Sequence, residues 1–295
     1  MTRFVPTILW LCCATAALAG MSGCREAAAI NPAPDVKLAE KLREGVGVAA
    51  ASEPGDDKAA QSTGAGWGTL KGKFVYSGDP PAPSFIPVSK DPDVCGQQVP
   101  NEQLIVDSGT KGISNILVFA RKVPRVYKPD DGAVAAAPAV FDQKNCIFLT
   151  HVLATQTKTP LEFKNSDSVS HNTSFTPGGL NEGVNPMLPQ NGTSMYKFGQ
   201  PMASPAPATC SIHPWMKAYI IARDDPYFAL SAKDGTFEIK NLPAGEEIEF
   251  QVWHELATGG LAAKPAWAKG RFKLKVPADG VEDLQAVEVP AAAFH

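Results

Sequence analysis

The stretch "ATCSIHPWMKAYII", residues 208–221, places a cysteine, a histidine and a methionine three residues apart and then continues as a β-branched and aromatic run. The chain has only five histidines and six methionines in 295 residues, so this spacing is unusual. The run that begins at Lys217 predicts a strand, and Cys210, His213 and Met216 lie in the loop before it. We therefore expect a metal-binding loop that ends where a strand begins.

Short runs of the same kind recur on both sides of this stretch. They extend from "GTLKGKFVYSG" at residue 68 to "RFKLKVPA" at residue 271, and Gly, Pro, Asn and Asp separate them. In "GTFEIKN" the alternation predicts that Phe237 and Ile239 face a core while the polar residues between them face water. Since no long segment with helical spacing follows residue 67, the sequence predicts an all-β fold.

The first residues have the pattern of an export signal. Arg3 is followed by the apolar run "FVPTILWLCCATAALAG" and then by "MSGC", which ends at Cys24. The run is short and flanked by small residues, so residues 1–23 are expected to be a signal peptide and not a lasting membrane helix. "MSGC" resembles a bacterial lipobox, which implies that Cys24 becomes a lipid-modified N-terminus; cleavage after Ala19 is the alternative.

Residues 24–66 are expected to form a tether. The segment contains no aromatic residue and cannot bury enough apolar surface to fold alone. Arg25 follows the lipobox cysteine, which by analogy with such lipoproteins favours the outer membrane. We therefore expect a lipid-anchored protein of the bacterial cell envelope that faces the periplasm.

The cysteine count is informative in an oxidising compartment. Of the six cysteines, two lie in the signal peptide and one is Cys24, which leaves Cys95, Cys146 and Cys210. An odd number of exported cysteines suggests one pair and one thiol with a special role. Because Cys210 belongs to the metal-binding loop, we expect a disulfide between Cys95 and Cys146.

The chemistry of the loop favours copper. A mononuclear site that cycles between Cu(I) and Cu(II) needs a soft thiolate, two imidazoles and usually a weak thioether. Cys210, His213 and Met216 supply three of these ligands. The second imidazole should come from a distant strand, and His171 in "FKNSDSVSHNTSF", residues 163–175, lies where a strand ends and a turn begins.

Structural zinc is the alternative metal. It would need four strong ligands, with His151 or His254 completing the set, and a thioether is a poor zinc ligand. Both histidines are instead expected to make ordinary hydrogen bonds. Met187, Met195 and Met202 precede the loop and are expected to pack, with Cu(I) transfer as the alternative.

The loop "CSIHPWM" resembles the ligand loop of cupredoxins, the blue copper proteins, in a form close to that of amicyanin. "NSDSVSHNTSF" is similar to the segment that carries their first histidine. The resemblance spans about residues 100–224 and implies a Greek-key β-sandwich with one type 1 copper and one-electron transfer. It makes His171, Cys210 and His213 the equatorial ligands and Met216 the axial one.

The same resemblance extends to the residues around the ligands. Asn172 resembles the family's asparagine that braces the ligand loop, which implies a hydrogen bond to the region of Ser211. Such bonds orient metal ligands and tune the metal. Trp215 lies between two expected ligands, where it would form either a docking patch for a redox partner or a hydrophobic lid.

The two ends of the chain resemble a second family. "DGTFEIKNLPAG" is similar to the carboxypeptidase regulatory-like sandwich, and "GTLKGKFVYSGDPP" looks like its opening strand. We therefore expect a cupredoxin-like domain at residues 91–226 and an accessory sandwich made of residues 67–90 and 227–295. With both segments in one exported chain, the sequence resembles the methylamine-utilisation-like proteins.

The net charge and the absence of several sequence motifs exclude some classes of function. The net charge is −3 and there is no basic run, so no nucleic-acid partner is expected. The sequence has no serine nucleophile elbow, glycine-rich phosphate loop or zinc-protease helix, so we do not expect an enzyme. The leading hypothesis is a membrane-anchored one-electron carrier with a redox partner in the envelope. The alternatives are a copper-delivery lipoprotein and an envelope interaction module with a structural metal.

Overall fold

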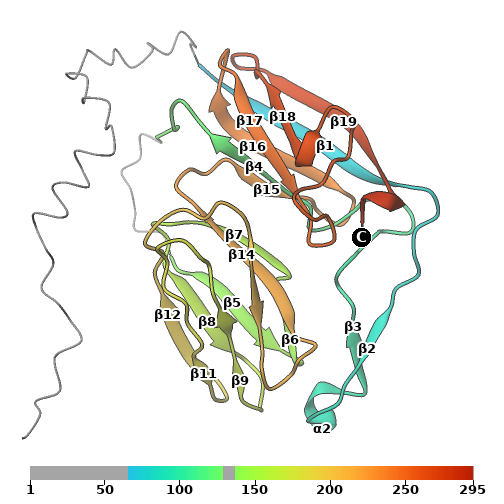
Figure 1. The fold of residues 1–295 in the computed structure, drawn as a ribbon, viewed down its shortest axis with the longest axis vertical. Helices are drawn as coiled ribbons and strands as arrows, with labels where there is room; N and C mark the ends of the chain where they lie inside the picture. The colour runs from blue at the N-terminus through green and yellow to red at the C-terminus, as the bar shows by residue number, and fades with distance from the viewer. Residues whose placement is uncertain (1–65, 129–136, 295) are drawn as a thin grey trace, which may run out of the picture. The chain divides into compact units, whose positions relative to one another are not determined.

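The computed structural model describes residues 66–128 and 137–294. The expected signal peptide, the lipid-bearing Cys24 and all but the last residue of the expected tether lie outside these ranges. Within them, strands predominate, and the helices are short, namely α2 (Pro92–Cys95), η1 (Ala268–Gly270) and η2 (Ala291–Ala293) (Figure 1). The prediction of an all-β fold is confirmed. Among the described residues, no helix combines the length and apolar character that crossing a membrane requires.

Strands from the two ends of the described chain, together with β4 (Leu117–Lys122), build two sheets around one core. A three-stranded sheet has the order β16, β1, β19, with bounds Thr236–Pro243, Trp67–Ser77 and Val281–Pro290. A four-stranded sheet has the order β15, β4, β17, β18, with bounds Phe228–Leu230, Leu117–Lys122, Ile248–Trp253 and Arg271–Leu274. Phe237 and Ile239 on β16 are buried while their polar neighbours are exposed, as the alternation predicts.

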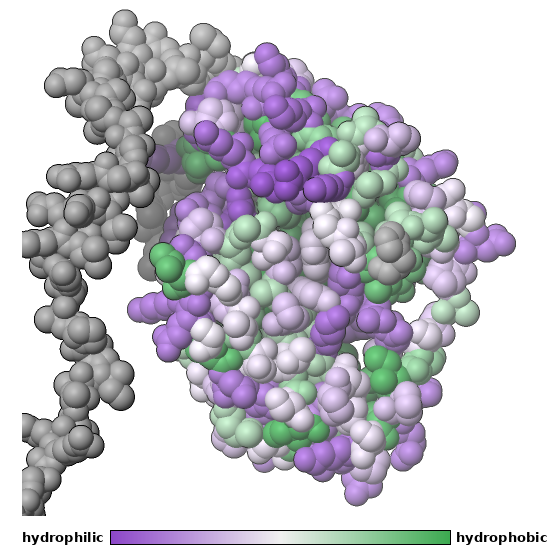
Figure 2. Space-filling model, in the orientation of Figure 1, coloured by the Kyte–Doolittle hydropathy of each residue, from purple (hydrophilic) through white to green (hydrophobic). Residues whose placement is uncertain are grey.

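The outer surface of this region is strongly hydrophilic over β17 and β18 (Figure 2). Two ion pairs lie there: Arg121 pairs with Glu249 at 3.1 Å, and Lys273 pairs with Glu247 at 3.0 Å. Because opposite charges are interspersed, this part of the surface has no field of a single sign.

The middle of the chain forms a β-sandwich around a second core. One sheet has the order β10, β13, β14, β7, with bounds Ser174–Phe175, Ala206–Thr209, Lys217–Arg223 and Val152–Gln156. The facing sheet has the order β12, β8, β5, β6, with bounds Thr193–Tyr196, Leu161–Asn165, Ala139–Lys144 and Ile147–Phe148. A short pair joins β9 (His171–Asn172) to β11 (Met187–Leu188). Side chains from these strands share one hydrophobic core, so the sheets pack as layers.

Strand β4 contributes to both cores. Val118 and Ala120 pack in the first core, which lies between the sheets of β1 and β4. Leu117 and Phe119 pack in the second core, that of the sandwich. Alternate side chains of a strand point to opposite faces, and both faces of β4 are covered. β4 belongs to the stretch expected for the cupredoxin-like domain, residues 91–226, yet it pairs with β15 and β17. The sheets therefore do not divide at the expected boundaries.

Residues 85–100 form a separate hairpin, which we call the strap. β2 (Phe85–Pro87) pairs antiparallel with β3 (Gln98–Pro100), and α2 lies between them (Figure 1). Cys95, at the end of α2, forms a disulfide with Cys146, which lies in the turn between β5 and β6; their Cα atoms are 5.2 Å apart. The predicted disulfide is confirmed, and it ties the tip of the strap to the sandwich.

Candidate metal centre

The loop between β13 and β14 carries three of the expected ligands. Strand β13 ends at Thr209 and β14 begins at Lys217, so the loop holds Cys210, His213 and Met216. Two backbone hydrogen bonds close it, from Cys210 N to Met216 O at 3.2 Å and from Met216 N to His213 O at 2.9 Å. All three side chains are buried. The tight turn thus fixes these residues at the end of the sandwich.

His171 comes from the other side of the site. It is the first residue of β9 and pairs with Leu188 of β11. The turn before it is held by Asn165, whose side-chain amide donates to the carbonyl oxygens of Val169 and Leu188 at 2.8 and 2.9 Å. The sequence predicts His171 where a strand ends and a turn begins; in the structure that strand, β8, ends earlier, at Asn165, and His171 opens the next strand with its imidazole fully buried.

Three donor atoms converge. Nδ1 of His171 and Nδ1 of His213 each lie 3.9 Å from Sγ of Cys210, and the two Nδ1 atoms lie 2.8 Å apart. Cys210 is the free cysteine among the described residues. Met216 is buried in the same core, one hydrogen-bonded turn away. Two imidazole nitrogens and a thiol sulfur form a donor set that suits copper or zinc.

Each imidazole is held on its far side by a carboxylate. His171 Nε2 lies 2.8 Å from Asp167 Oδ2, and His213 Nε2 lies 3.0 Å from Asp91 Oδ2. An ionised carboxylate only accepts hydrogen bonds, so each Nε2 donates, and in the neutral imidazole Nδ1 then carries the lone pair. A carboxylate hydrogen-bonded to a ligating histidine fixes its tautomer and makes the imidazole a stronger electron-pair donor to the metal.

The two facing Nδ1 atoms of His171 and His213 favour a cation between the rings. Two nitrogen lone pairs that face each other at 2.8 Å repel unless a positive charge lies between them. Burial lowers the pKa of His171, the hydrogen bond with Asp167 opposes that effect, and the nearby His213 lowers the pKa further. A metal ion would satisfy both nitrogens and the sulfur together. The residues fit a bound copper ion.

Asp167 and Asp91 were not anticipated from the sequence. Asp167 stands four residues before His171, a spacing that could have flagged it, and its carboxylate also accepts hydrogen bonds from the backbone N–H groups of Asn145 and Cys146. Asp91 lies on the strap, far from His213 in the sequence, and no local pattern marks it. Both carboxylates lie near the turn that holds Cys146: Asp167 through its hydrogen bonds to that turn, and Asp91 through the strap that the disulfide ties to it.

Asn172 connects the two ligand-bearing segments. Its side-chain oxygen accepts a hydrogen bond from the backbone N–H of Ser211 at 2.8 Å and lies 3.4 Å from Sγ of Cys210. Its amide group donates to Asn185 at 2.6 Å and to Ser211 Oγ at 3.3 Å. These contacts hold the cysteine end of the loop against β9, which is the arrangement the cupredoxin resemblance implies.

Trp215 lies against the site from the outside. Its ring centroid is 5.2 Å from that of His213, and its Nε1 donates to the carbonyl oxygen of Cys146 at 3.0 Å. The side chain is partly exposed. It therefore forms a contact between the buried histidine and the surface.

The remaining candidate residues lie elsewhere. His151 pairs with Glu255, and the Nδ1 atom of His254 accepts a hydrogen bond from the backbone N–H of Leu256 at 3.3 Å. Neither histidine belongs to a group of converging ligand atoms in the described chain. Met202 is buried, whereas Met187 and Met195 are exposed. Cys95 and Cys146 lie near His213, and Cys146 also lies near His171, but as a disulfide they offer no thiolate.

Comparisons with known proteins give only weak matches. No family model matches the chain, and no curated protein matches it. Among solved structures, the reduced Cu(I) form of an amicyanin variant is 22% identical over 30% of this chain and 86% of its own, with a TM-score of 0.27. A copper-containing nitrite reductase from Thermus scotoductus is 22% identical over 33% of this chain and 25% of its own, also with a TM-score of 0.27. These scores are too low to assign the chain to a family.

Proposed function

We propose that the chain binds one copper ion through Sγ of Cys210 and Nδ1 of His171 and His213, with Met216 as a weak fourth ligand. Bound copper supplies a Cu(I)/Cu(II) couple, and the chain then acts as a one-electron carrier. The supporting observation is the pair of Nδ1 atoms 2.8 Å apart, each on a ring whose opposite nitrogen contacts a carboxylate. The thioether of Met216 favours copper over zinc.

The burial of the ligands favours electron transfer over catalysis on the metal. Cys210 is 2% exposed, and His171 and His213 are fully buried. A substrate therefore has no open approach to the donor atoms, whereas an electron needs only a short path. Asp91, Asp167 and Asn172 accept hydrogen bonds that restrain the ligands, so the ligands move little when the charge at the site changes.

The proposal includes a location. An export signal and a lipid-modified Cys24 would anchor the protein to the bacterial envelope, facing the periplasm, where a redox protein would exchange electrons with it. The disulfide between Cys95 and Cys146 supports an oxidising compartment. Palmitate labelling of the expressed protein, compared with Cys24→Ala, tests the anchor.

A copper titration tests the metal site. The metal-free full chain is titrated with Cu(II) and followed by visible and EPR spectroscopy. One equivalent should give an intense band near about 600 nm with narrow copper hyperfine splitting, which a thiolate ligand produces. Cys210→Ser should abolish the band, while Ser211→Ala, which keeps the backbone N–H that binds Asn172, should retain it. A colourless copper complex of the unsubstituted chain would refute the proposal.

Copper delivery is a second candidate. Met187 is 61% exposed and pairs in register with Asn172, next to His171, so a thioether that can receive Cu(I) lies beside the ligand-bearing strand. In this case Met187→Leu should slow Cu(I) transfer to a chelator several-fold. Met195→Leu, on the edge strand β12, serves as the matched control. Equal transfer rates in both variants would leave electron transfer as the better proposal.

A further inference from the structure

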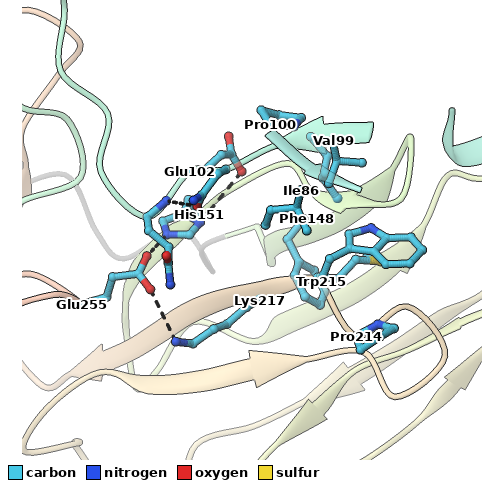
Figure 3. Close-up of a pocket in the computed structure, with 14 residues that line it drawn as sticks. Ile86, Val99, Pro100, Glu102, Phe148, His151, Pro214, Trp215, Lys217 and Glu255 are labelled. Carbon is cyan, nitrogen blue, oxygen red and sulfur yellow. Dashed lines mark hydrogen bonds and ion pairs between the residues drawn. The ribbon is translucent and has the colours of Figure 1, made fainter. Parts of the chain in front are cut away.

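A pocket of about 340 Å³ lies beside the metal-binding loop, and Met216, the proposed weak ligand, is one of the residues that line it. The strap forms one side of this pocket through Ile86 and Val99, and the loop forms another through Trp215 (Figure 3). Its volume falls at the lower end of the range for small-molecule sites. The pocket is therefore large enough for a single aromatic ring with a few substituents.

One end of the pocket is apolar. Phe148 and Trp215 lie beside each other there, with Ile86 and Val99 above them in Figure 3. Aromatic and aliphatic walls of this kind bind a flat ring through contact area and edge or face packing. The Nε1 atom of Trp215 is held by Cys146, so this wall is fixed in position.

The other end carries a charged cluster. The Nε2 atom of His151 is hydrogen-bonded to Glu255, and the second carboxylate oxygen of Glu255 lies 3.5 Å from Nζ of Lys217. Glu102 faces the opposite nitrogen of His151 at 3.8 Å, a distance too long for a hydrogen bond. Glu255 is thus fully engaged and buried, whereas Glu102, with 29% of its side chain exposed, keeps acceptor capacity toward the pocket.

The chemistry of Glu102 suits a hydroxyl donor. Burial raises the pKa of its carboxyl group above the ordinary value, and the nearby His151 opposes that effect. A carboxylate with increased proton affinity is a good acceptor for an O–H group. A metal ion fits less well, because the two nitrogens of His151 face different carboxylates and no three ligand atoms converge among the residues described at this end of the pocket.

Trp215 joins this pocket to the metal centre. Its ring lies 5.2 Å from the ring of His213, which is itself fully buried and held by Asp91 of the strap. A molecule in the pocket is therefore separated from His213 by one indole ring, and Met216 also lines the pocket. Asp91 of the strap covers Nε2 of His213, and Trp215 provides an aromatic contact between the pocket and this histidine.

We propose that this pocket binds a small aromatic alcohol of the phenol or hydroquinone class and that this alcohol is the electron donor to the metal centre. The ring packs on Trp215 and Phe148, and the hydroxyl group donates a hydrogen bond to Glu102. The donor role rests on the proposed function, whereas the binding site does not. When the donor reacts, its O–H bond breaks, the proton passes to the Glu102 carboxylate, and one electron reduces the oxidised copper. The donor leaves as a neutral radical.

Binding is tested on the metal-free full chain with fluorine NMR. The probe is 4-fluorophenol, and 4-fluoroanisole, which has the same ring but no O–H donor, is the control ligand. The phenol should bind about tenfold more tightly, the usual effect of one hydrogen bond to a charged group. Glu102→Leu should remove this difference. Glu247→Leu, at an exposed carboxylate paired with Lys273, should preserve it.

Each outcome of this measurement either supports or refutes the proposed binding site. Equal affinity of phenol and anisole for the unsubstituted chain, or no binding of either, refutes the proposal without any variant. A preference for the phenol that survives Glu102→Leu places the hydroxyl elsewhere and also refutes it.

The donor role is tested separately on the copper-loaded chain. Hydroquinone should bleach the visible band about tenfold more slowly in Glu102→Leu, because the loss of the hydrogen bond weakens donor binding. Hexaammineruthenium(II), a reductant with no hydroxyl group, should act equally on both proteins. Equal rates with hydroquinone refute the donor role. If the chain gives no blue copper centre, the donor role fails with the proposed function, while the NMR result still decides the binding site.

Discussion

The carboxylate of Asp91 accepts a hydrogen bond from Nε2 of His213 at 3.0 Å, although the two residues are 122 positions apart in the sequence. The hydrogen bond exists because the strap folds over the end of the sandwich and is tied there through Cys95 and Cys146. It buries a histidine of the ligand loop and turns its Nδ1 atom toward Cys210.

Replacement of this carboxylate should change the metal centre without dismantling it. Asn in place of Asp91 still accepts the hydrogen bond but removes the negative charge, so the imidazole becomes a poorer electron donor. We expect Asp91→Asn to raise the reduction potential and to weaken Cu(II) binding by about tenfold. Voltammetry and a competition titration measure the two effects. Asp93→Asn, two residues away and exposed, should change neither, and equal shifts in both variants would contradict this role.

Removal of the disulfide should loosen the strap. β2 and β3 pair only with each other in the described structure, and the disulfide joins residues 51 positions apart. The double variant Cys95→Ser/Cys146→Ser should lose about 2–4 kcal/mol of unfolding free energy. Limited proteolysis should then cut first within residues 85–100. Cleavage elsewhere, with the strap intact, would show that its packing alone holds it.

Acid should destabilise the fold through His254. Burial lowers the pKa of this histidine from 6.5 to about 4, with the nearby Glu255 opposing the effect. The unfolded chain then takes up a proton at higher pH than the folded chain. The stabilisation is present above pH 6.5 and is lost as the pH falls toward 4, by about 3 kcal/mol in all.

Urea unfolding at about pH 7 and about pH 4.5, on either side of the ordinary histidine pKa, measures this effect. The unsubstituted chain should lose more stability between these two pH values than His254→Gln, which cannot titrate but retains a hydrogen-bond acceptor for Leu256. Acidic groups away from this histidine contribute equally to both proteins, so the difference reports on His254 together with its neighbour Glu255. Parallel losses in the two proteins would show that the histidine is not desolvated in solution.

The ligand loop and the strand after it could be predicted because both signals are local. Cys210, His213 and Met216 are within seven residues of one another, and Lys217 begins a strand of β-branched and aromatic residues. The disulfide followed from counting, because only two cysteines were left to pair. The hydrogen bond of Asn172 with Ser211 was implied by the cupredoxin resemblance.

Interactions across long stretches of sequence were not predictable in this way. Asp91 reaches His213 from the strap, and Glu255 reaches His151 across 104 positions. An isolated sequence carries no periodic signal for such pairs, because they depend on how the loops fold over the sheets. The run "ILVFA" at residues 116–120 did indicate a strand. That its side chains pack in two cores could be seen only once the pairing of the sheets was known.

X-ray absorption at the copper edge measures the donor set itself. On the full chain loaded with one equivalent of copper, we predict one sulfur neighbour at short distance and two imidazole nitrogens. In Cys210→Ser the spectrum should show no short copper–sulfur distance. Asp93→Asn should give the same spectrum as the unsubstituted chain, since that carboxylate touches no ligand. A copper site with only nitrogen and oxygen neighbours in the unsubstituted chain would contradict the assignment of Cys210, His171 and His213 as the metal centre.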